Sequence, residues 1–393
     1  MTRVARLTGL DRTGVAVAAA IRPAGHVLQV SNGKGETFGR AVAGALLEAA
    51  ELWAAERPAV AAWGAARDLE PSARLLAPAD LGDAGTGSRE VRLAWSAARD
   101  LQSAEPVLVP AHAVHCPPPG AAWLGPALLP WTSNGMGAHP EASAALLHAL
   151  LEAIERDRLA RALPDGFTER EVARRLVDPR SLADAAPRTA RWVERIQKRG
   201  FRAYLLDLSA LRGDAESGSG SGPFDSAPPA GRRYAQGDRQ RKRPESRSGK
   251  SRWRALDLGL PCAAAVLVDA QGGAVPIAAG YACRLSRDAA LLAALLEAAQ
   301  SRLTEIHGAR EDVAHGDREA AAPLAGWCAA TRPIRRGARM PDVRARTPAA
   351  GVRQVLSRMR RARLGGAVVR LPAPPRVHVV KVLVPGLLLS ELL

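Results

Sequence analysis

Two pairs of glutamates stand three residues apart in segments with helical periodicity. Glu48 and Glu51 lie in ALLEAAELW, and Glu152 and Glu155 lie in HALLEAIER. Residues three apart share one face of a helix, so each pair sets two carboxylates side by side at the border of an apolar stripe. One such pair alone is typical of a solvated helix face. Repelling carboxylates beside apolar residues favour a cation between them, and Mg²⁺ prefers a few carboxylate oxygens together with phosphate oxygens.

A third helical segment carries more polar side chains. Glu297 and Gln300 stand three residues apart in ALLEAAQSRLTEIHGARED, and Arg302 follows two residues later. Taken alone, Glu-x-x-Gln-x-Arg is typical of an ordinary helix surface. The spacing by itself therefore leaves the function of this set open.

Both glutamate pairs follow a Ser-Asn-Gly triplet, which the sequence predicts to be a turn. The first copy continues into Gly33-Lys34-Gly35, a lysine between two glycines. A Walker A loop would need a further glycine at position 28, where leucine stands, so that phosphate loop is excluded. Lys34 then fits either a plain turn or a mobile loop that aims one ammonium group at phosphate. The second copy begins at Ser133.

The composition of the 393-residue chain bounds its class. Its length fits one large domain or two ordinary ones, and 47% hydrophobic residues are enough for a substantial core. The net charge of +16 would favour nucleic acid, but half of it comes from residues 231–254 and the remainder of the chain is only moderately basic. We therefore expect no specific nucleic-acid binding, although anions in general would be attracted.

Cysteine and histidine form no recognisable metal or redox motif. The four cysteines are far apart, which excludes a CxxC pair and fits free thiols in a reducing cytoplasm. The eight histidines show no HExxH-like spacing; we expect His148 to pack within its helix, and His112 and His115 to lie in a loop. No apolar run approaches the roughly 18–20 residues that span a bilayer, so no membrane association is expected.

The periodicity of apolar residues predicts the elements that must hold these side chains. Helices are expected at 40–56, 141–162, 168–177, 189–199, 288–307 and 351–364. Strands are expected at 15–21, 26–30, 106–110, 201–208, 275–283 and 377–384, with a further buried strand within 257–270. Strands near both ends and helices between them predict an α+β protein with mixed sheets flanked by helices. The two Ser-Asn-Gly copies predict an internal pseudo-repeat.

Residues 212–252 differ from the rest of the chain. They contain SGSGSG and RQRKRPESRSGK and almost no apolar side chains, so burial cannot repay the entropy of ordering them. We expect a disordered basic insertion between a first part of one domain, 1–211, and its second part, 253–393. The insertion is either a solvated spacer or a docking segment for an acidic peptide or partner.

In their order along the chain, these segments resemble the YcaO family. Thr8–Gly35 is similar to the family's N-terminal segment, and Ser133–Asp157 is similar to its central motif. Glu297–Asp312 resembles its third motif, and His378–Leu387 resembles its usual C-terminal strand. The similarity covers nearly the whole chain outside 212–252, and it implies the family's own fold and the binding of ATP and Mg²⁺.

What the resemblance implies is the activation of a peptide-backbone amide. A nucleophile adds to the carbonyl carbon, the amide oxygen attacks the γ-phosphate of ATP, and phosphate then leaves with that oxygen. A Cys, Ser or Thr side chain as the nucleophile gives an azoline, whereas a sulfide donor gives a thioamide. Phosphorylation turns a poor leaving group into a good one, so the protein mainly has to position the groups and offset phosphate charge.

The resemblance also implies roles for the residues named above. The carboxylates that match Mg²⁺ ligands are Glu48, Glu51, Glu152, Glu155 and Glu297. The matches to nucleotide- or phosphate-binding positions are Ser31, Lys34, Asn134, Gln300 and Arg302. The expected catalytic residues are Glu152, Glu155, Arg156 and Arg302. The sequence departs from the family at Ala45, Leu52, His139, Ala144-Ala145 and Ala293, where Ser, Arg, Gly, Glu-Ala and Arg are usual.

The branch of the family is predicted from features that the chain lacks. Azoline-forming members often end in a Pro-x-Pro-x-Pro tail or carry a partner domain, and neither stands in this sequence. We expect thioamide formation on a peptide or protein with a separate TfuA-type partner. An azoline-forming cyclodehydratase is the alternative within the enzyme class, and Ala45, Leu52 and Ala144 motivate a degenerate, non-catalytic scaffold. A homodimer in the cytoplasm is expected.

Overall fold

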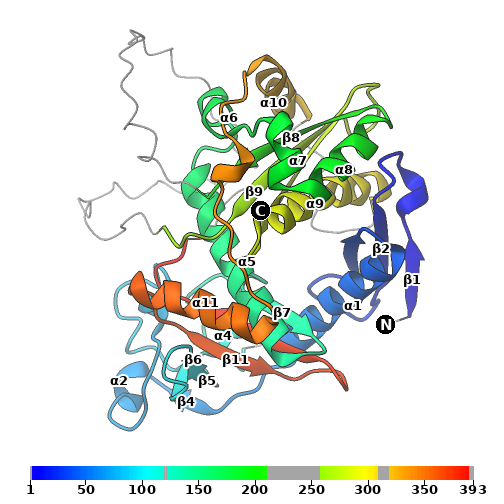
Figure 1. The fold of residues 1–393 in the computed structure, drawn as a ribbon. Coiled ribbons are helices and arrows are strands. Elements are labelled where there is room, and N and C mark those ends of the chain that lie inside the picture. The colour runs from blue at the N-terminus through cyan, green and yellow to red at the C-terminus, as the bar shows by residue number, and fades with distance from the viewer. Residues whose placement is uncertain (1, 119, 121, 210–256, 309–317, 389–393) are drawn as a thin grey trace.

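The computed structural model describes residues 2–118, 120, 122–209, 257–308 and 318–388, and Figure 1 shows the course of the chain. The segment 212–252, which the sequence predicts to be an insertion, lies outside the described residues, so the division of the domain around it stays a prediction. Among the described helices, none combines the length and apolar character needed to cross a bilayer.

Three sheets form the framework, with the orders β1-β2-β3, β10-β9-β8 and β4-β5-β11-β12-β7, and β6 also pairs with β5. Their bounds are β1 Arg3–Arg6, β2 Ala16–Ile21, β3 Val30–Gly35, β4 Ala62–Gly64, β5 Leu93–Asp100, β6 Pro106–Pro110, β7 Met136–His139, β8 Phe201–Asp207, β9 Cys262–Asp269, β10 Ile277–Cys283, β11 Ala367–Leu371 and β12 His378–Leu383. The α+β class is confirmed, but the prediction of mixed sheets is wrong. All named strands pair antiparallel, since direct connections such as β1-β2 and β9-β10 join neighbours as hairpins.

Three long helices cover the sheets: α1 (Phe38–Ala55), α5 (Ala142–Ala162) and α9 (Arg287–His307). The other helices are α2 Ala66–Leu69, α3 Pro78–Leu81, α4 Ala111–Val114, α6 Glu169–Arg175, α7 Leu182–Ala185, α8 Pro187–Gln197, α10 Arg318–Ala330 and α11 Pro348–Arg361. Thr37 and Ser286 cap α1 and α9, because each hydroxyl accepts a hydrogen bond from an N–H of the first turn. Gly308 ends α9 in the left-handed conformation, with φ of 63°.

The long helices and the sheets form three strand–helix units arranged in a ring. Helix α1 packs on β2 and β3 and reaches β7 of the next unit. Helix α5 packs on β7 and β12 and reaches β10, while α9 packs on β9 and β10 and returns to β3. Figure 1 shows the three helices around the middle of the molecule. The sequence predicted a repeat of two copies, and the structure adds a third.

A glycine in one strand of each unit sets the distance between strand and helix. A Cβ atom would lie 2.0 Å from the helix backbone at Gly33 and 2.3 Å from it at both Gly137 and Gly280. The backbone atoms that it would meet belong to alanines four residues apart, namely Ala41 and Ala45, Ala145 and Ala149, and Ala294 and Ala298. Only glycine permits so close an approach. The three contacts place the three helices in the same register on their strands.

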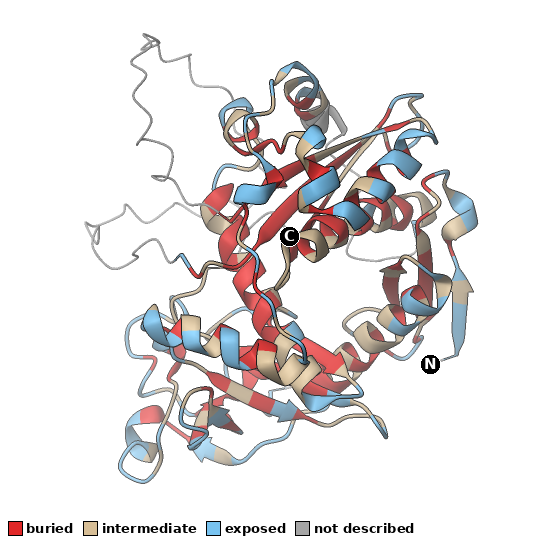
Figure 2. Ribbon diagram, viewed as in Figure 1, coloured by how far each residue is buried: buried red, intermediate tan, exposed pale blue. Residues whose placement is uncertain are grey.

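The cores lie between these layers. One cluster surrounds α5 and extends to β9, β10 and α11, and a second joins α8 and α9 to the sheet β10-β9-β8. A third cluster lies between α1 and the largest sheet. Figure 2 shows that α5 is buried along much of its length, whereas α8 and α11 expose their outer faces. Helix α5 is therefore the central element on which two of the units meet.

The first Ser-Asn-Gly triplet is not a turn, which corrects the prediction. Ser31–Gly35 belong to β3 and pair with β2, with Asn32 opposite Ala19. Gly33 is needed for the close approach of α1 and not for a reversal of the chain. The second triplet does form a turn, in which Gly135 has φ of 76°. The predicted strand at 26–30 is also wrong, because β3 begins only at Val30.

The remaining expected elements are confirmed to within a few residues, and two central strands were missed. Strands β5 and β11 pair with each other in the largest sheet. The segment of β5, LAWSAARD, combines polar residues with alanine, so its alternation is weak in the sequence.

Candidate functional site

Side chains near the end of each long helix reach the strand of the following unit. Glu51 accepts a hydrogen bond from the N–H of Ala138 in β7 at 2.7 Å. Glu155 accepts one from the N–H of Cys283 in β10 at 2.8 Å. In the third unit, the hydroxyl of Thr304 accepts a hydrogen bond of 2.8 Å from the side-chain amide of Asn32, in β3. These contacts close the ring and turn the polar ends of the helices toward one centre.

Lys34 and Glu297 join the first unit to the third. The Lys34 ammonium lies 2.7 Å from Oε2 of Glu297, and about a quarter of each side chain, 23%, remains exposed. The other carboxylate oxygen of Glu297 accepts a hydrogen bond from the N–H of Tyr281 at 3.3 Å. Because both side chains are partly exposed, water or a ligand reaches this ion pair.

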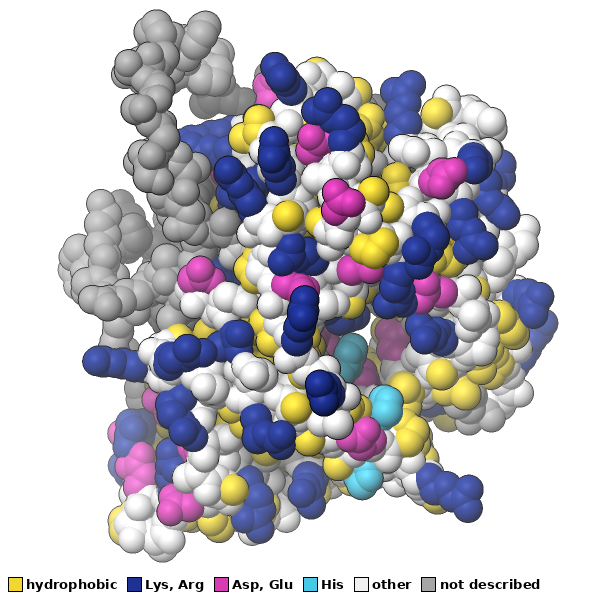
Figure 3. Space-filling model, viewed as in Figure 1, with side chains coloured by type: hydrophobic (Ala, Val, Ile, Leu, Met, Phe, Trp, Pro, Cys, Tyr) yellow, Lys and Arg dark blue, Asp and Glu magenta, His cyan; other side chains and the backbone are white. Residues whose placement is uncertain are grey.

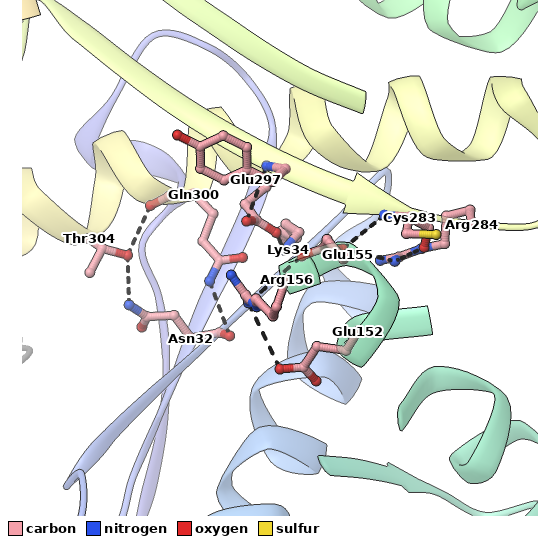
Figure 4. A network of polar contacts seen from close by, with 11 residues as sticks. Asn32, Lys34, Glu152, Glu155, Arg156, Cys283, Arg284, Glu297, Gln300 and Thr304 are labelled. Carbon is pink, nitrogen blue, oxygen red and sulfur yellow. Dashed lines mark hydrogen bonds and ion pairs between the residues drawn. The ribbon is translucent and has the colours of Figure 1, made fainter. Parts of the chain in front are cut away.

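Arg156 lies between the two carboxylates of the second pair. Its Nη2 atom is 3.9 Å from Oε1 of Glu152 and 3.7 Å from Oε1 of Glu155. Arg284 approaches Glu155 from the other side, at 3.9 Å. Figure 4 shows Lys34, Arg156 and Glu297 pointing toward one another, together with Glu152 and Glu155. Figure 3 shows acidic and histidine side chains at the floor of a hollow in this face of the molecule.

The pleat of β3 separates the residues of the first triplet. Successive side chains of a strand point to opposite faces, so Ser31 and Gly33 lie on the face toward α1. Asn32 and Lys34 point the other way, where the Asn32 carbonyl accepts a hydrogen bond of 3.3 Å from Gln300. The predicted residue Ser31 is buried outside this network. Asn32, which was not predicted as a site residue, lies within it. The alternation of side chains along a strand was the signal that could have found it.

Burial raises the pKa of three of the glutamates. Burial first, and then the charge of Glu152 and Glu48, raises the pKa of Glu51 well above its usual range. Burial, with Glu155 and Glu297 adding to it against Arg156 and Lys381, raises the pKa of Glu152 to about 7. The pKa of Glu155 is also raised, chiefly by burial. Each of these carboxylates is therefore poised to exchange a proton for a metal ion.

The pKa values of Glu297 and Arg156 shift in the directions that favour their charged forms. Burial opposes ionisation of Glu297, but Lys34 and Arg156 outweigh it and lower the pKa of this carboxyl. Burial likewise opposes the charge of Arg156, and the carboxylates around it outweigh that cost and raise its pKa. Glu297 and Arg156 thus form a charged pair of opposite sign beside carboxylates that hold their protons more tightly.

The donor set fits Mg²⁺ shared with a nucleotide better than a closed protein cage. Within the described ranges, no three His, Cys, Asp or Glu side chains converge closely enough to hold one ion among themselves. Mg²⁺ usually takes one or two carboxylates, keeps several waters and binds phosphate oxygens for the remainder of its shell. Oxygen donors spread over five glutamates match that mode of binding.

Buried polar atoms without partners also fit a polar ligand. Among the described residues, Oδ1 of Asn32, Oδ1 of Asn134 and Nη1 of Arg156 are buried and have no hydrogen bond. Such atoms are costly in a folded protein unless water or a ligand satisfies them. The free Nη1 donor of Arg156 suits an anionic oxygen, as in a phosphate group.

The Arg302 side chain pairs with two aspartates rather than with the carboxylates of the network. Its guanidinium lies 3.1 Å from Asp11 and 2.9 Å from Asp269, and Arg12 also pairs with Asp269. Both aspartates are almost fully buried, so this arrangement resembles a structural ion network at the edge of the site. Local spacing could not predict this network, because Asp11 and Asp269 are remote from Arg302 in the chain.

The expectations for histidine are corrected. His148 does not pack within its helix, because its side chain is exposed. His112 lies in α4 rather than in a loop, whereas the expectation that His115 lies in a loop is confirmed, and both side chains are buried. Lys381 in β12 was not predicted as a site residue. It is 2% exposed, donates a hydrogen bond to the carbonyl of Thr132, and has a pKa that burial lowers to about 8.

The fold and the site together define a class: an α+β protein in which three strand–helix units gather carboxylates and cations around one centre. The chain belongs to the YcaO family. The family model described as YcaO cyclodehydratase, ATP- and Mg²⁺-binding, matches residues 32–213 and 252–388. ATP and Mg²⁺ are therefore the cofactors of the family, in accord with the character of the donors described above.

The chain is similar to curated relatives and to several solved structures. A protein of Rhizobium leguminosarum bv. trifolii, described as an uncharacterized protein in the tfuA 3′ region, is 29% identical over 335 residues, which are 79% of this chain and 64% of that protein. The YcaO protein of Methanopyrus kandleri bound with AMPPCP and Mg²⁺ has a TM-score of 0.64 at 20% identity, over 98% of this chain and 85% of that chain. A heterocyclase in complex with substrate and cofactor has a TM-score of 0.65 at 17% identity, over 99% of this chain and 50% of that chain. The chain thus spans less than two thirds of the Rhizobium relative, and the solved structures establish the fold.

Proposed function

We propose that this protein uses Mg-ATP to phosphorylate the oxygen of a peptide-backbone amide, and that the product is a thioamide formed with a separate TfuA-type partner. The observation that carries the proposal is the centre of the ring, where glutamates of α5 and α9 meet Lys34 and Arg156. Glu51 of α1 lies close enough for the charge of Glu152 to raise its pKa. The Rhizobium relative from the tfuA 3′ region supports the choice of partner.

The five carboxylates would hold Mg²⁺ with the phosphates of ATP, and the ion would supply charge neutralisation there. In the proposal, Lys34, Asn134 and Gln300 contact the nucleotide. Ser31, on the α1 face of β3, and Arg302, in its ion network, position the elements that carry these residues. Asn32 joins this set, since its Oδ1 atom is buried without a partner. Arg156 directs its free Nη1 donor at a phosphate oxygen and, held by Glu152 and Glu155, keeps a fixed orientation.

The reaction then follows from what these residues position. The nucleophile adds to the amide carbon, and the π electrons of the carbonyl move to its oxygen. That oxygen attacks the γ-phosphorus, and the bond to the leaving ADP oxygen breaks. Expulsion of phosphate breaks the carbon–oxygen bond and completes the substitution. Lys34 and Arg156 offset the charge that spreads over the phosphoryl oxygens, and the buried surroundings strengthen this effect.

Azoline formation is the second candidate product, because the heterocyclase in complex with substrate and cofactor has the same fold. Mass spectrometry of a candidate peptide separates the two outcomes. Replacement of oxygen by sulfur adds about 16 Da, whereas cyclodehydration removes about 18 Da, as the stoichiometry of each reaction requires. A homodimer and a cytoplasmic location stay predictions.

The test of the proposed function is peptide-dependent ATP hydrolysis by the purified protein with its TfuA-type partner. We expect hydrolysis in the wild type and its loss in Glu152→Ala. The matched control is Glu194→Ala, which removes an exposed carboxylate of α8 that pairs only with Lys198 among the described residues. Equal hydrolysis in the wild type and in Glu152→Ala would contradict the proposal. A protein that binds no Mg-ATP in calorimetry would instead support a non-catalytic scaffold.

A further inference from the structure

His148 lies on the face of α5 that carries the site. It stands four residues before Glu152 and eight before Arg156, so the three side chains follow one another along the helix within a narrow stripe. The His148 side chain is exposed, although α5 is otherwise deeply buried. In the part of the chain that the structure describes, no hydrogen bond or ion pair to another residue occupies its imidazole.

The register of the three units places His148 at the position that Glu297 holds in the third unit. Gly137 contacts the backbone of Ala145 and Ala149, as Gly280 contacts Ala294 and Ala298. Three residues after the first alanine of each pair stand His148 and Glu297, respectively. From this position Glu297 extends over its own strand toward the centre of the ring, where it meets Tyr281 N–H and Lys34.

His148, at the equivalent position of the second unit, can likewise extend over its own strand toward the centre of the ring. The first unit has Gly44 there, so it contributes no side chain at this position. The ring therefore has three equivalent places around its centre, of which one is bare, one holds a carboxylate paired with Lys34, and one holds an imidazole without a partner.

The groups that face His148 come from all three units. They are Arg284, which follows β10, Lys34 in β3, His139 in β7 and Arg156 in α5. Enclosure by the protein, and then these cationic groups, lowers the pKa of His148. The imidazole is exposed to solvent at the same time, so water screens part of the effect of these charges. A neutral imidazole keeps one ring nitrogen free to accept a proton.

Resting on the proposed function, we propose that His148 is the catalytic base that takes the proton of the attacking nucleophile. As the sulfur or oxygen of the nucleophile forms its bond to the amide carbon, its X–H bond breaks and the proton passes to the free nitrogen of His148. The carbonyl π electrons move to the amide oxygen, which is then the oxygen that attacks the γ-phosphorus. The five glutamates are assigned to Mg²⁺, whereas the His148 imidazole has no hydrogen bond or ion pair to another described residue.

Nucleotide binding would prepare His148 for this role. The phosphates of ATP bring negative charge close to Lys34 and Arg156, which offsets the cations that lower the pKa of the imidazole. A higher pKa makes the neutral imidazole a stronger base near working pH. The base would therefore gain strength when the phosphate acceptor is in place.

The experiment compares His148→Gln, His148→Ala and the control His378→Gln in the full-length protein with its TfuA-type partner. His378 is an exposed histidine of β12 that, among the described residues, makes no side-chain contact with the site network. Product formation and peptide-dependent ATP hydrolysis are measured between about pH 4 and 8.5. The range extends well below the ordinary histidine pKa of about 6.5 because the pKa of His148 is lowered. Mg-AMPPNP affinity is measured in parallel by calorimetry.

For His148→Gln we expect a loss of kcat of about 100-fold or more, in the range of general-base catalysis, with the nucleotide affinity within about twofold of wild type. The acidic limb of the pH profile, where the wild-type rate falls as the imidazole is protonated, should disappear. Added imidazole should restore part of the rate of His148→Ala, and His378→Gln should behave as wild type.

Three outcomes would count against this role. Wild-type rates and pH profile in His148→Gln would overturn it and leave the proposed function intact. Loss of Mg-AMPPNP binding, without rescue by imidazole, would show that His148 supports the site rather than accepts the proton. Absence of peptide-dependent ATP hydrolysis in the wild type would overturn the proposed function, and this inference with it.

Discussion

Lys34 Nζ lies 2.7 Å from Glu297 Oε2, and this ion pair joins β3 of the first strand–helix unit to α9 of the third. The two residues are 263 positions apart in the chain. Their contact joins the first and third units at the centre of the ring. A lysine that the sequence offers only as a residue between two glycines thereby becomes a cation of the site.

Replacement of this cation tests its role in nucleotide binding. We expect Lys34→Met to weaken Mg-AMPPNP binding by about 10- to 100-fold, which corresponds to the roughly 1.5–3 kcal/mol of a hydrogen bond to a charged group. The control is Lys198→Met, which breaks the exposed Lys198–Glu194 ion pair on α8. Calorimetric titration of both variants measures the difference. Similar affinities for the two variants would mean that Lys34 only holds Glu297 in place.

The raised pKa of Glu152 makes stability depend on pH. The folded protein binds the Glu152 proton more tightly than the unfolded chain, so stability falls as pH rises from about 4.5 to about 7 and then levels off. The cost at pH 8 is up to about 3 kcal/mol, on the order of 1.4 kcal/mol per unit of pKa. Glu152→Gln should therefore be more stable than wild type at pH 8 without Mg²⁺, and equally stable near pH 4. Urea denaturation at both pH values provides the measurement.

Mg²⁺ binding should offset the loss of stability that accompanies rising pH. A carboxylate must lose its proton to bind Mg²⁺, so Mg²⁺ with AMPPNP should stabilise the wild type more at pH 8 than at pH 5.5. The gain should be smaller in Glu152→Gln, which lacks one donor. A stabilisation that does not change with pH, or that is the same in the variant, would count against Glu152 as a Mg²⁺ ligand.

The strand glycines give a test of the ring itself. A Cβ at Gly280 would lie 2.3 Å from the N atom of Ala298, so Gly280→Ala must push α9 away from β10. We expect a loss of stability of about 1–3 kcal/mol or more, and weaker Mg-AMPPNP binding because Glu297 moves with the helix. Gly39→Ala is the control, because a Cβ there meets no atom within 4 Å and lies in a helix that alanine favours. Thermal denaturation should separate the two variants clearly.

Variants of Arg302 test whether this residue stabilises the fold or binds the nucleotide. Arg302→Gln leaves Asp11 and Asp269 buried with less compensating charge, which costs roughly 3–5 kcal/mol for a buried pair. Combining it with Asp11→Asn and Asp269→Asn should recover part of that stability, because no uncompensated carboxylate remains. Denaturant unfolding of the single and triple variants checks this. If the triple variant is stable and still binds Mg-AMPPNP as wild type does, Arg302 has a structural role.

Local spacing identified the carboxylates that share one helix face, and their roles in the site were predicted from the resemblance to the family. The i, i+3 glutamate pairs could be found because a helix places such residues on one face whatever surrounds it. The long helices were predicted for the same reason, since their apolar periodicity is a local property. The first Ser-Asn-Gly triplet misled the prediction, because glycine allows a turn and a close strand–helix contact equally well.

What the sequence determined by itself is which residue types are available, on which helices they lie, and the family that their order resembles. Only the tertiary structure decided which of them meet. Asn32 rather than Ser31 joins the network because the pleat of β3 directs alternate side chains to opposite faces. Arg302 pairs with Asp11 and Asp269, which are remote from it in the sequence. His148 stands at the position equivalent to Glu297 because α5 and α9 pack on their strands in the same register. Contacts between units depend on packing across hundreds of residues, which local spacing does not encode.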